Sequence, residues 1–403
     1  MKSIIRTGLI AAWGIVLSAC NSSVATSSTQ TNNYAYVTNL YSNSISMYSI
    51  NSSNGTLTPL TPPTIPTELS PTMIAVDSSN THAYVTNFGE STISIYSINP
   101  TTGQLYLESS VSTRPSPFSI ALDKSSTHAY VTHGSRLLES TNCAEGCGVS
   151  VWQINPQSGN LTEESYISTE SNNPGVIKLS SSGKYAYLTG YTKNGSDKAY
   201  STIFTFMVLS NGILIEESAL SITGKISITT ALSPLNDYAY FGAYYESSNS
   251  SSINIYNIDS ENGSISYSSS SESSESTDIT NLMLDSSGTH AYASFIESKN
   301  ESSTLLLQTY NIESSGKLAL ESSISLGAPA VSVGMTFDPS GTYAYINYIE
   351  LTKTNSDKYE PSTTMNGSVN MLSVDKNSGL LTPIIPSSVS TQVAPIFITT
   401  TNY

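Results

Sequence analysis

Apolar and polar residues alternate over many short stretches of this chain, and turns rich in Ser, Asn, Gly or Pro separate these stretches. A clear set of four stretches occupies residues 73–77, 83–87, 92–98 and 104–108. Alternation with a period of two is typical of half-buried strands. The pattern therefore predicts groups of four short antiparallel strands.

These groups repeat along the chain. An Ala-Tyr pair marks the second stretch of every group, and the copies begin at Ala35, Ala83, Ala129, Ala186, Ala239, Ala291 and Ala344. Successive copies are 48, 46, 57, 53, 52 and 53 residues apart. Four strands in a period of about 50 residues are typical of a propeller blade. We therefore expect an all-β, seven-bladed β-propeller of four-stranded antiparallel blades, formed as a single domain by residues 34–403.

The first copy lacks the strand that should precede it, because it begins directly at residues 34–39. A matching apolar stretch stands at the other end of the chain, at residues 393–399. Pairing between these two segments would remove the free edges of an open array. We expect the C-terminal strand to complete the first blade.

Several residue types that often serve catalysis recur at fixed places in the repeats. Four aspartates open the first hairpin, at Asp77, Asp123, Asp285 and Asp338. Three histidines, His82, His128 and His290, stand where the other copies have Tyr. Recurrence at one position favours structural roles. We expect the aspartates to cap turns and the rings to fill one aromatic packing position.

Charge excludes some partners. Only 11% of residues are charged, against roughly 25% in an average soluble domain, and 30 acidic residues face 15 basic ones. Loss of residues 1–19 would remove Lys2 and Arg6 and leave a charge of 13 − 30 = −17. Nucleic-acid binding needs a basic surface, so no nucleic acid partner is expected. We also expect no cofactor.

The N-terminus has the pattern of an export signal. Lys2 and Arg6 precede an apolar run over residues 8–17, which is too short to span a bilayer. The following Leu-Ser-Ala-Cys20 resembles the lipobox of bacterial lipoproteins, which implies cleavage after residue 19 and lipidation of Cys20. An ordinary secretory signal remains the alternative. We expect a lipid anchor in the cell envelope, at the outer membrane in a Gram-negative cell, and a flexible tether over residues 20–33.

The Ala-Tyr copies carry a family motif. Ala35-Tyr-Val-Thr-Asn39 and Ala83-Tyr-Val-Thr-Asn87 resemble the YVTN-repeat, lactonase-like family of seven-bladed propellers. The resemblance implies the propeller fold and is compatible with lactonases that act on 6-phosphogluconolactone, with surface-layer proteins and with exported propellers of other roles. In the lactonases, the implied site lies at the mouth of the central channel. The motif residues Asn39 and Asn87 are candidates for binding a ligand.

The third copy contains an unusually long loop after His133, which replaces the motif asparagine. His133 with Arg136, and Arg114 on the preceding loop, could form a site in which histidine is the general base and arginine stabilises an oxyanion. A solvated polar loop is the alternative. Cys143 and Cys147 favour a small disulfide in an exported protein. Zinc binding with His133 and free thiols are alternatives, but a fourth zinc ligand is not evident, so no metal is expected.

These observations together favour a lipoprotein that uses its propeller surface for binding or scaffolding, with an unknown ligand and an envelope protein or glycan as partner. The stretches that correspond to the lactonase site contain no histidine, which favours binding over catalysis. The alternatives are a lactonase-type hydrolase with a diverged site and a surface-layer-like structural protein.

Overall fold

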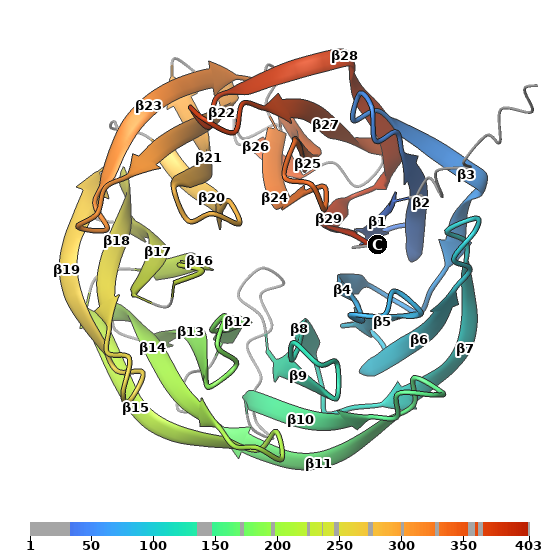
Figure 1. Cartoon of the computed structure of the whole chain (residues 1–403), viewed down its shortest axis with the longest axis horizontal. Coiled ribbons are helices and arrows are strands. Elements are labelled where there is room, and N and C mark those ends of the chain that lie inside the picture. Colours follow the sequence, from blue (N-terminus) through green and yellow to red (C-terminus); the bar gives the residue numbers. More distant parts are fainter. Residues whose placement is uncertain are drawn as a thin grey trace, which may run out of the picture. The chain divides into compact units, whose positions relative to one another are not determined.

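Seven sheets surround a common centre in the computed structural model of the chain (Figure 1). The structure describes residues 33–401, apart from 135–146, 170–172, 195–197, 224–225, 236, 246–249, 273–276, 300–301, 327–329, 354–358 and 362–365. Six sheets have four antiparallel strands and one has five. The predicted seven-bladed propeller is confirmed.

The strands of each blade are given from the centre outward. Blade 1 contains β29 (Pro395–Thr400), β1 (Asn33–Asn39), β2 (Ser44–Ile50) and β3 (Leu57–Pro66). Blade 2 contains β4 (Pro71–Val76), β5 (His82–Asn87), β6 (Thr92–Ile98) and β7 (Leu105–Ser112). Blade 3 contains β8 (Pro117–Leu122), β9 (His128–His133), β10 (Gly148–Ile154) and β11 (Leu161–Ser168). Blade 4 contains β12 (Asn173–Leu179), β13 (Tyr185–Asn194), β14 (Lys198–Val208) and β15 (Leu214–Thr223).

The remaining blades follow the same order. Blade 5 contains β16 (Ile226–Leu232), β17 (Tyr238–Tyr245), β18 (Ser250–Ile258) and β19 (Ile265–Glu272). Blade 6 contains β20 (Thr277–Leu284), β21 (His290–Lys299), β22 (Ser302–Ile312) and β23 (Leu318–Ser325). Blade 7 contains β24 (Ala330–Phe337), β25 (Tyr343–Lys353), β27 (Asn366–Val374) and β28 (Leu381–Val393), and β26 (Tyr359–Pro361) pairs with β25.

The ring closes at blade 1, where the C-terminal strand β29 pairs with β1. Beyond the ladder, Tyr34 N donates to Thr401 Oγ1 and Thr401 N donates to Tyr34 O, each at 2.9 Å. The expected closure is therefore confirmed. It leaves blade 1 as the place where the two ends of the propeller meet.

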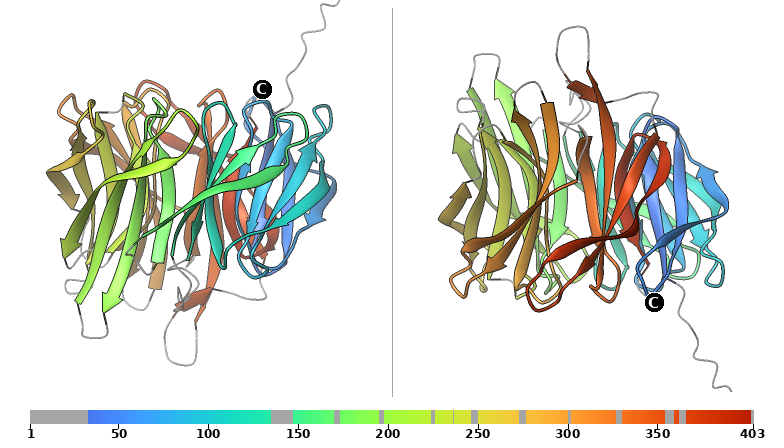
Figure 2. Two further views of the ribbon diagram at one scale, coloured as in Figure 1. Left: turned by 90° about the horizontal axis from the view of Figure 1, so that it is seen from below. Right: turned by 90° about the horizontal axis from the view of Figure 1, so that it is seen from above.

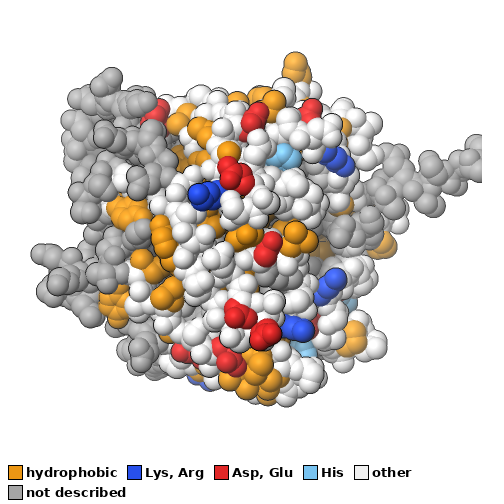
Figure 3. Space-filling model, turned by 60° about the vertical axis from the view of Figure 1, so that its left-hand side comes forward, with side chains coloured by type: hydrophobic (Ala, Val, Ile, Leu, Met, Phe, Trp, Pro, Cys, Tyr) orange, Lys and Arg blue, Asp and Glu red, His pale blue; other side chains and the backbone are white. Residues whose placement is uncertain are grey.

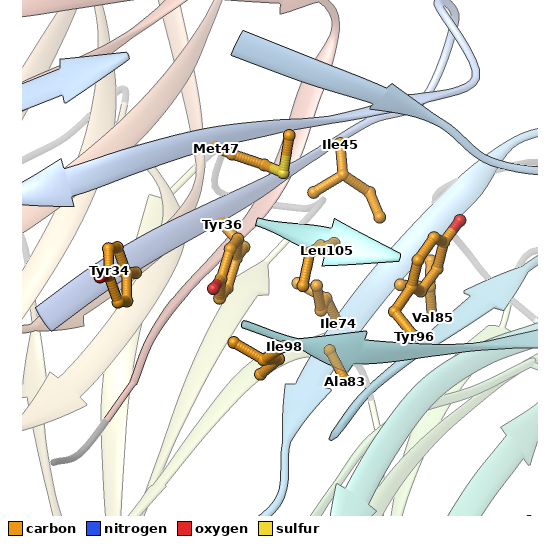
Figure 4. Packing of buried hydrophobic residues seen from close by; sticks show 10 residues of the cluster. All are labelled: Tyr34, Tyr36, Ile45, Met47, Ile74, Ala83, Val85, Tyr96, Ile98 and Leu105. Carbon is orange, nitrogen blue, oxygen red and sulfur yellow. The ribbon is translucent and has the colours of Figure 1, made fainter. Parts of the chain in front are cut away.

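Aromatic rings join each blade to the next. The ring at the position before each Ala-Tyr pair lies against the glycine that closes the third hairpin of the following blade, as Tyr34 does at Gly103 and His82 at Gly159. In blade 1, Tyr36 Oη also donates to Gly103 O at 2.7 Å. Figure 4 shows Tyr36 beside apolar side chains of blades 1 and 2. The predicted aromatic packing position is confirmed.

The aspartates cap turns, as expected. Asp77 Oδ1 accepts from Thr81 N at 2.7 Å and Asp123 Oδ1 accepts from Thr127 N at 2.7 Å. The same arrangement recurs at Asp285 and Asp338. These carboxylates accept hydrogen bonds from the backbone of their own turns, so turn capping accounts for their recurrence and a catalytic role is not needed to explain them.

The ring has two different faces, which Figure 2 shows edge-on. On the turn face lie the tight hairpins between first and second strands and between third and fourth strands, such as 77–82 and 99–104. On the loop face lie the connections between blades and between second and third strands.

The side view in Figure 3 has few charged side chains among many uncharged ones. No helix among the described residues is long and apolar enough to cross a membrane.

Candidate functional site

His133, at the end of β9, is 1% exposed and makes hydrogen bonds through both ring nitrogens. Nδ1 lies 3.1 Å from Arg114 O and 3.3 Å from Pro115 O, so it carries the proton and donates. Nε2 lies 2.7 Å from Ser150 Oγ and therefore accepts from that hydroxyl, which in turn accepts from Trp152 Nε1 at 2.7 Å. Both nitrogens of the imidazole are thus hydrogen-bonded, and the ring is buried.

Burial lowers the pKa of His133 to about 4, even though the hydrogen bonds to the two carbonyl groups act to raise it. The ring is neutral near pH 7. Its acceptor nitrogen is nevertheless occupied by Ser150, so it cannot take a proton from a water molecule without rearrangement. This geometry suits a ring that fixes the blade-to-blade loop onto β9 and β10.

The motif asparagines play the same structural role in blades 1 and 2. Asn39 Nδ2 donates to Ser46 Oγ at 3.0 Å, and Asn87 Nδ2 donates to Ser94 Oγ at 2.8 Å. These serines lie opposite the Val of the motif, as Ser150 does in blade 3. Both asparagine side chains are completely buried. The structure therefore places them inside the blades, where they hold the second and third strands together.

Arg114 contacts His133 through its main chain, while its guanidinium group extends toward the outer strand β11. Nε lies 3.2 Å from Glu163 Oε1, and Cζ lies 3.9 Å above the Tyr166 ring. The guanidinium group thus forms an ion pair with Glu163 and a cation–π contact with Tyr166. Arg136, the other candidate arginine, lies outside the described residues.

Cys147 is 3% exposed and disulfide-bonded. Its expected partner Cys143 lies outside the described residues, so the pairing stays a prediction, as does lipidation of Cys20. Among the residues that the structure describes, no three His, Cys, Asp or Glu side chains gather as a metal site would require.

The innermost strands of the blades offer a different candidate. The inner strands β4, β8, β12, β16, β20, β24 and β29 surround the centre of Figure 1, and Lys178 and Asp278 are the only charged residues in these seven strands. Lys178 stands second from the end of β12, next to the turn face. Asp278 stands at the opposite end of β20.

The Lys178 side chain is exposed to solvent, yet burial lowers the pKa of its ammonium group. Both hold when many protein atoms surround a side chain that water still reaches. Residues at the same place in blades 2, 3 and 5 are Ala75, Ala121 and Ala231. Aligning the repeats shows that a lysine stands where three other blades have alanine. The alternation of apolar and polar residues within one strand does not show this.

The amino-acid sequence matches a known family near its N-terminus. Residues 24–135 match the family model described as Lactonase, 7-bladed beta-propeller. The chain is a seven-bladed propeller, and over these residues it is similar to the lactonase family. Among curated proteins, no match was found for it.

Solved structures similar to this propeller share its fold at low identity. A proposed 6-phosphogluconolactonase from Bacteroides fragilis is 15% identical, with a TM-score of 0.68 over 93% of this chain and 99% of that one. The periplasmic gluconolactonase PpgL of Pseudomonas aeruginosa is 15% identical, with a TM-score of 0.67 over 92% and 99%. A hypothetical selenium-binding protein from Sulfolobus tokodaii reaches 0.68 at 11% identity, over 92% and 93%. Such likeness establishes the fold alone.

Proposed function

We propose that this propeller hydrolyses a lactone in its central channel. The match of residues 24–135 to the lactonase family model carries this proposal. Full-length similarity to a periplasmic gluconolactonase and to a proposed 6-phosphogluconolactonase is consistent with it. Catalysis is thereby preferred over the binding or scaffolding role that the sequence favoured.

Lys178 is the residue to which we assign a catalytic role. Its ammonium group would donate a hydrogen bond to the lactone carbonyl oxygen and stabilise the negative charge that develops there when water attacks. The water oxygen bonds to the carbonyl carbon, the ring C–O bond breaks, and a proton from water reaches the leaving alkoxide. The product is a hydroxy acid.

The expected substrate is uncharged. A phosphorylated lactone would need clustered guanidinium groups, and Arg114 is already paired with Glu163. One ammonium group does not balance a phosphate dianion. We therefore expect unphosphorylated γ- or δ-lactones to be hydrolysed faster than 6-phosphogluconolactone.

The test is acid release in a pH-stat by protein that begins at Asn21, with a panel of these lactones. Lys178→Met should abolish turnover, whereas Lys184→Met, which removes a charge from an exposed position in the adjacent turn, should retain it. His133→Asn should also retain it. Wild-type rates no higher than buffer would refute the hydrolase proposal and favour a binding surface.

Anchoring in the cell envelope is a separate proposal. It depends on the basic start, the apolar run and Cys20, all of which lie outside the described residues. Metabolic labelling with a radioactive fatty acid should mark the wild-type protein and leave Cys20→Ser unlabelled. Equal labelling of both proteins would contradict the assignment.

A further inference from the structure

The fourth strand of each blade lies at the outer rim of the ring (Figure 1). Within the part of the chain that the structure describes, it pairs on one side only, with the third strand. Its other edge leaves backbone N–H and C=O groups open to pairing with another chain, and native sheets commonly protect such edges with charges or prolines. An outer strand without this protection is a candidate for contact between molecules.

Six of the seven outer strands carry such protection. A β-bulge interrupts every outer strand, and in four of them the extra residue is an exposed glutamate. These glutamates are Glu108, Glu164, Glu217 and Glu321. The strands β3 and β28 contain prolines instead, including Pro59 and Pro383. A charge at the edge would lose water if another strand paired there, and a proline has no N–H to donate.

Blade 5 lacks this protection. The bulge residue of β19 is Ser268, which is exposed and uncharged. From Ile265 to Ser271 the strand contains no charged residue and no proline, and only its last residue, Glu272, is acidic. Beside the bulge, the Tyr267 side chain is 55% exposed and offers apolar surface for a partner to cover. The edge of β19 is therefore open to a further strand.

We propose that two copies of this chain pair through their β19 edges, antiparallel and about a two-fold axis. A symmetric pair needs a surface that complements itself. The strand β19 meets this requirement, because its serines can hydrogen-bond to those of its copy and antiparallel pairing sets the two Glu272 residues at opposite ends. A basic peptide would instead favour the outer strands that carry glutamates. Pairing would join the two copies of blade 5 into one continuous sheet.

This inference goes beyond lactone hydrolysis and does not depend on it. A single strand pair is a small interface, so we expect a weak dimer that forms as the protein concentration rises. The formal charge of −15 on each chain opposes association. Salt screens this repulsion, so dimerisation should increase with ionic strength.

Sedimentation velocity over a range of protein concentrations, at low and high salt, tests the pairing with protein that begins at Asn21. The wild-type protein should shift from monomer toward a species of twice the mass. Ser268→Glu introduces the residue that four other blades have at the bulge, so it should fold and weaken dimerisation about tenfold or more. Thr58→Glu, which adds the same charge to an exposed position of β3 in blade 1, should dimerise as wild type does. Ser266→Glu places the charge elsewhere on β19, should also weaken the dimer, and replaces Ser268→Glu if thermal melts show that variant to be unstable.

Three results would overturn the inference. A monomer at every concentration and at both salt levels would exclude pairing between copies. Equal dimerisation of wild type and a folded Ser268→Glu variant would place the interface elsewhere. Equal weakening by Thr58→Glu would attribute the effect to net charge rather than to the edge of β19.

Discussion

Acidification should destabilise the folded protein through His133, because this ring is buried in its neutral form. The pKa of His133 is about 4 in the folded chain, against about 6.5 for an unfolded histidine. The unfolded chain therefore takes up a proton first as the pH falls. The stabilisation is complete above about pH 6.5 and is lost between about pH 6.5 and pH 4. This linkage amounts to about 2 kcal/mol at pH 5 and about 3 kcal/mol at pH 4.

Urea unfolding at about pH 7.5 and about pH 5, for wild type and His133→Asn, measures this contribution. Asparagine bonds the equivalent serine in blades 1 and 2, so the variant should fold. The free energy of unfolding of wild type should fall by about 2 kcal/mol more than that of the variant. The other histidines are common to both proteins and cancel.

Carboxylates should not obscure the difference. Partial burial acts to raise the pKa of Asp123, but hydrogen bonds from Thr127 and His128 outweigh it, so the pKa is lowered. Its contribution is present above the unfolded pKa of about 3.9 and is lost below it, outside the measured window. An equal loss of stability in both proteins would refute the explanation based on His133.

Three further predictions concern the stability of the propeller. Gly103→Ala adds a Cβ 2.1 Å from the Tyr34 side chain at φ +70°, whereas the Cβ of Gly183→Ala meets nothing within 4 Å at φ +71°. Thermal melts should show that Gly103→Ala lowers the free energy of unfolding by about 3 kcal/mol and Gly183→Ala by about 1 kcal/mol, and equal losses would exclude the contact with Tyr34 as the cause. Tyr36→Phe removes a buried hydrogen bond and should cost about 1–3 kcal/mol in urea unfolding, while Tyr84→Phe, whose hydroxyl has no partner among the described residues, should cost almost nothing. Deletion of residues 394–403 removes β29 and should abolish cooperative unfolding followed by circular dichroism; an unchanged transition would show that closure is dispensable.

The repeated pattern was sufficient to predict the blades and their closure. Each blade uses the same alternation, and the strand missing before residues 34–39 could be found at the C-terminus. The turn aspartates and the ring at His82 were also predictable, because recurrence separates structural roles from catalytic ones. Local chemistry repeated in every blade is visible in a sequence compared with itself.

The candidate site was less predictable, because its properties arise between strands. A histidine at the motif asparagine suggested a catalytic base, but its partner Ser150 follows a long loop and comes opposite only through strand pairing. The role that we assign to Lys178 depends on its place in β12, the innermost strand of its blade. The alternating pattern of one strand does not report which positions an assembled ring leaves open to solvent.

The placement of β1 also has a mechanical consequence. This strand lies between β29 and β2, so Asn33 begins a strand that is bonded along both edges. A pull at Asn33 along the strand would load both ladders in shear, and all their hydrogen bonds would share the force. The seam of the ring would then resist traction at the N-terminus, although it is the one blade assembled from both ends of the chain.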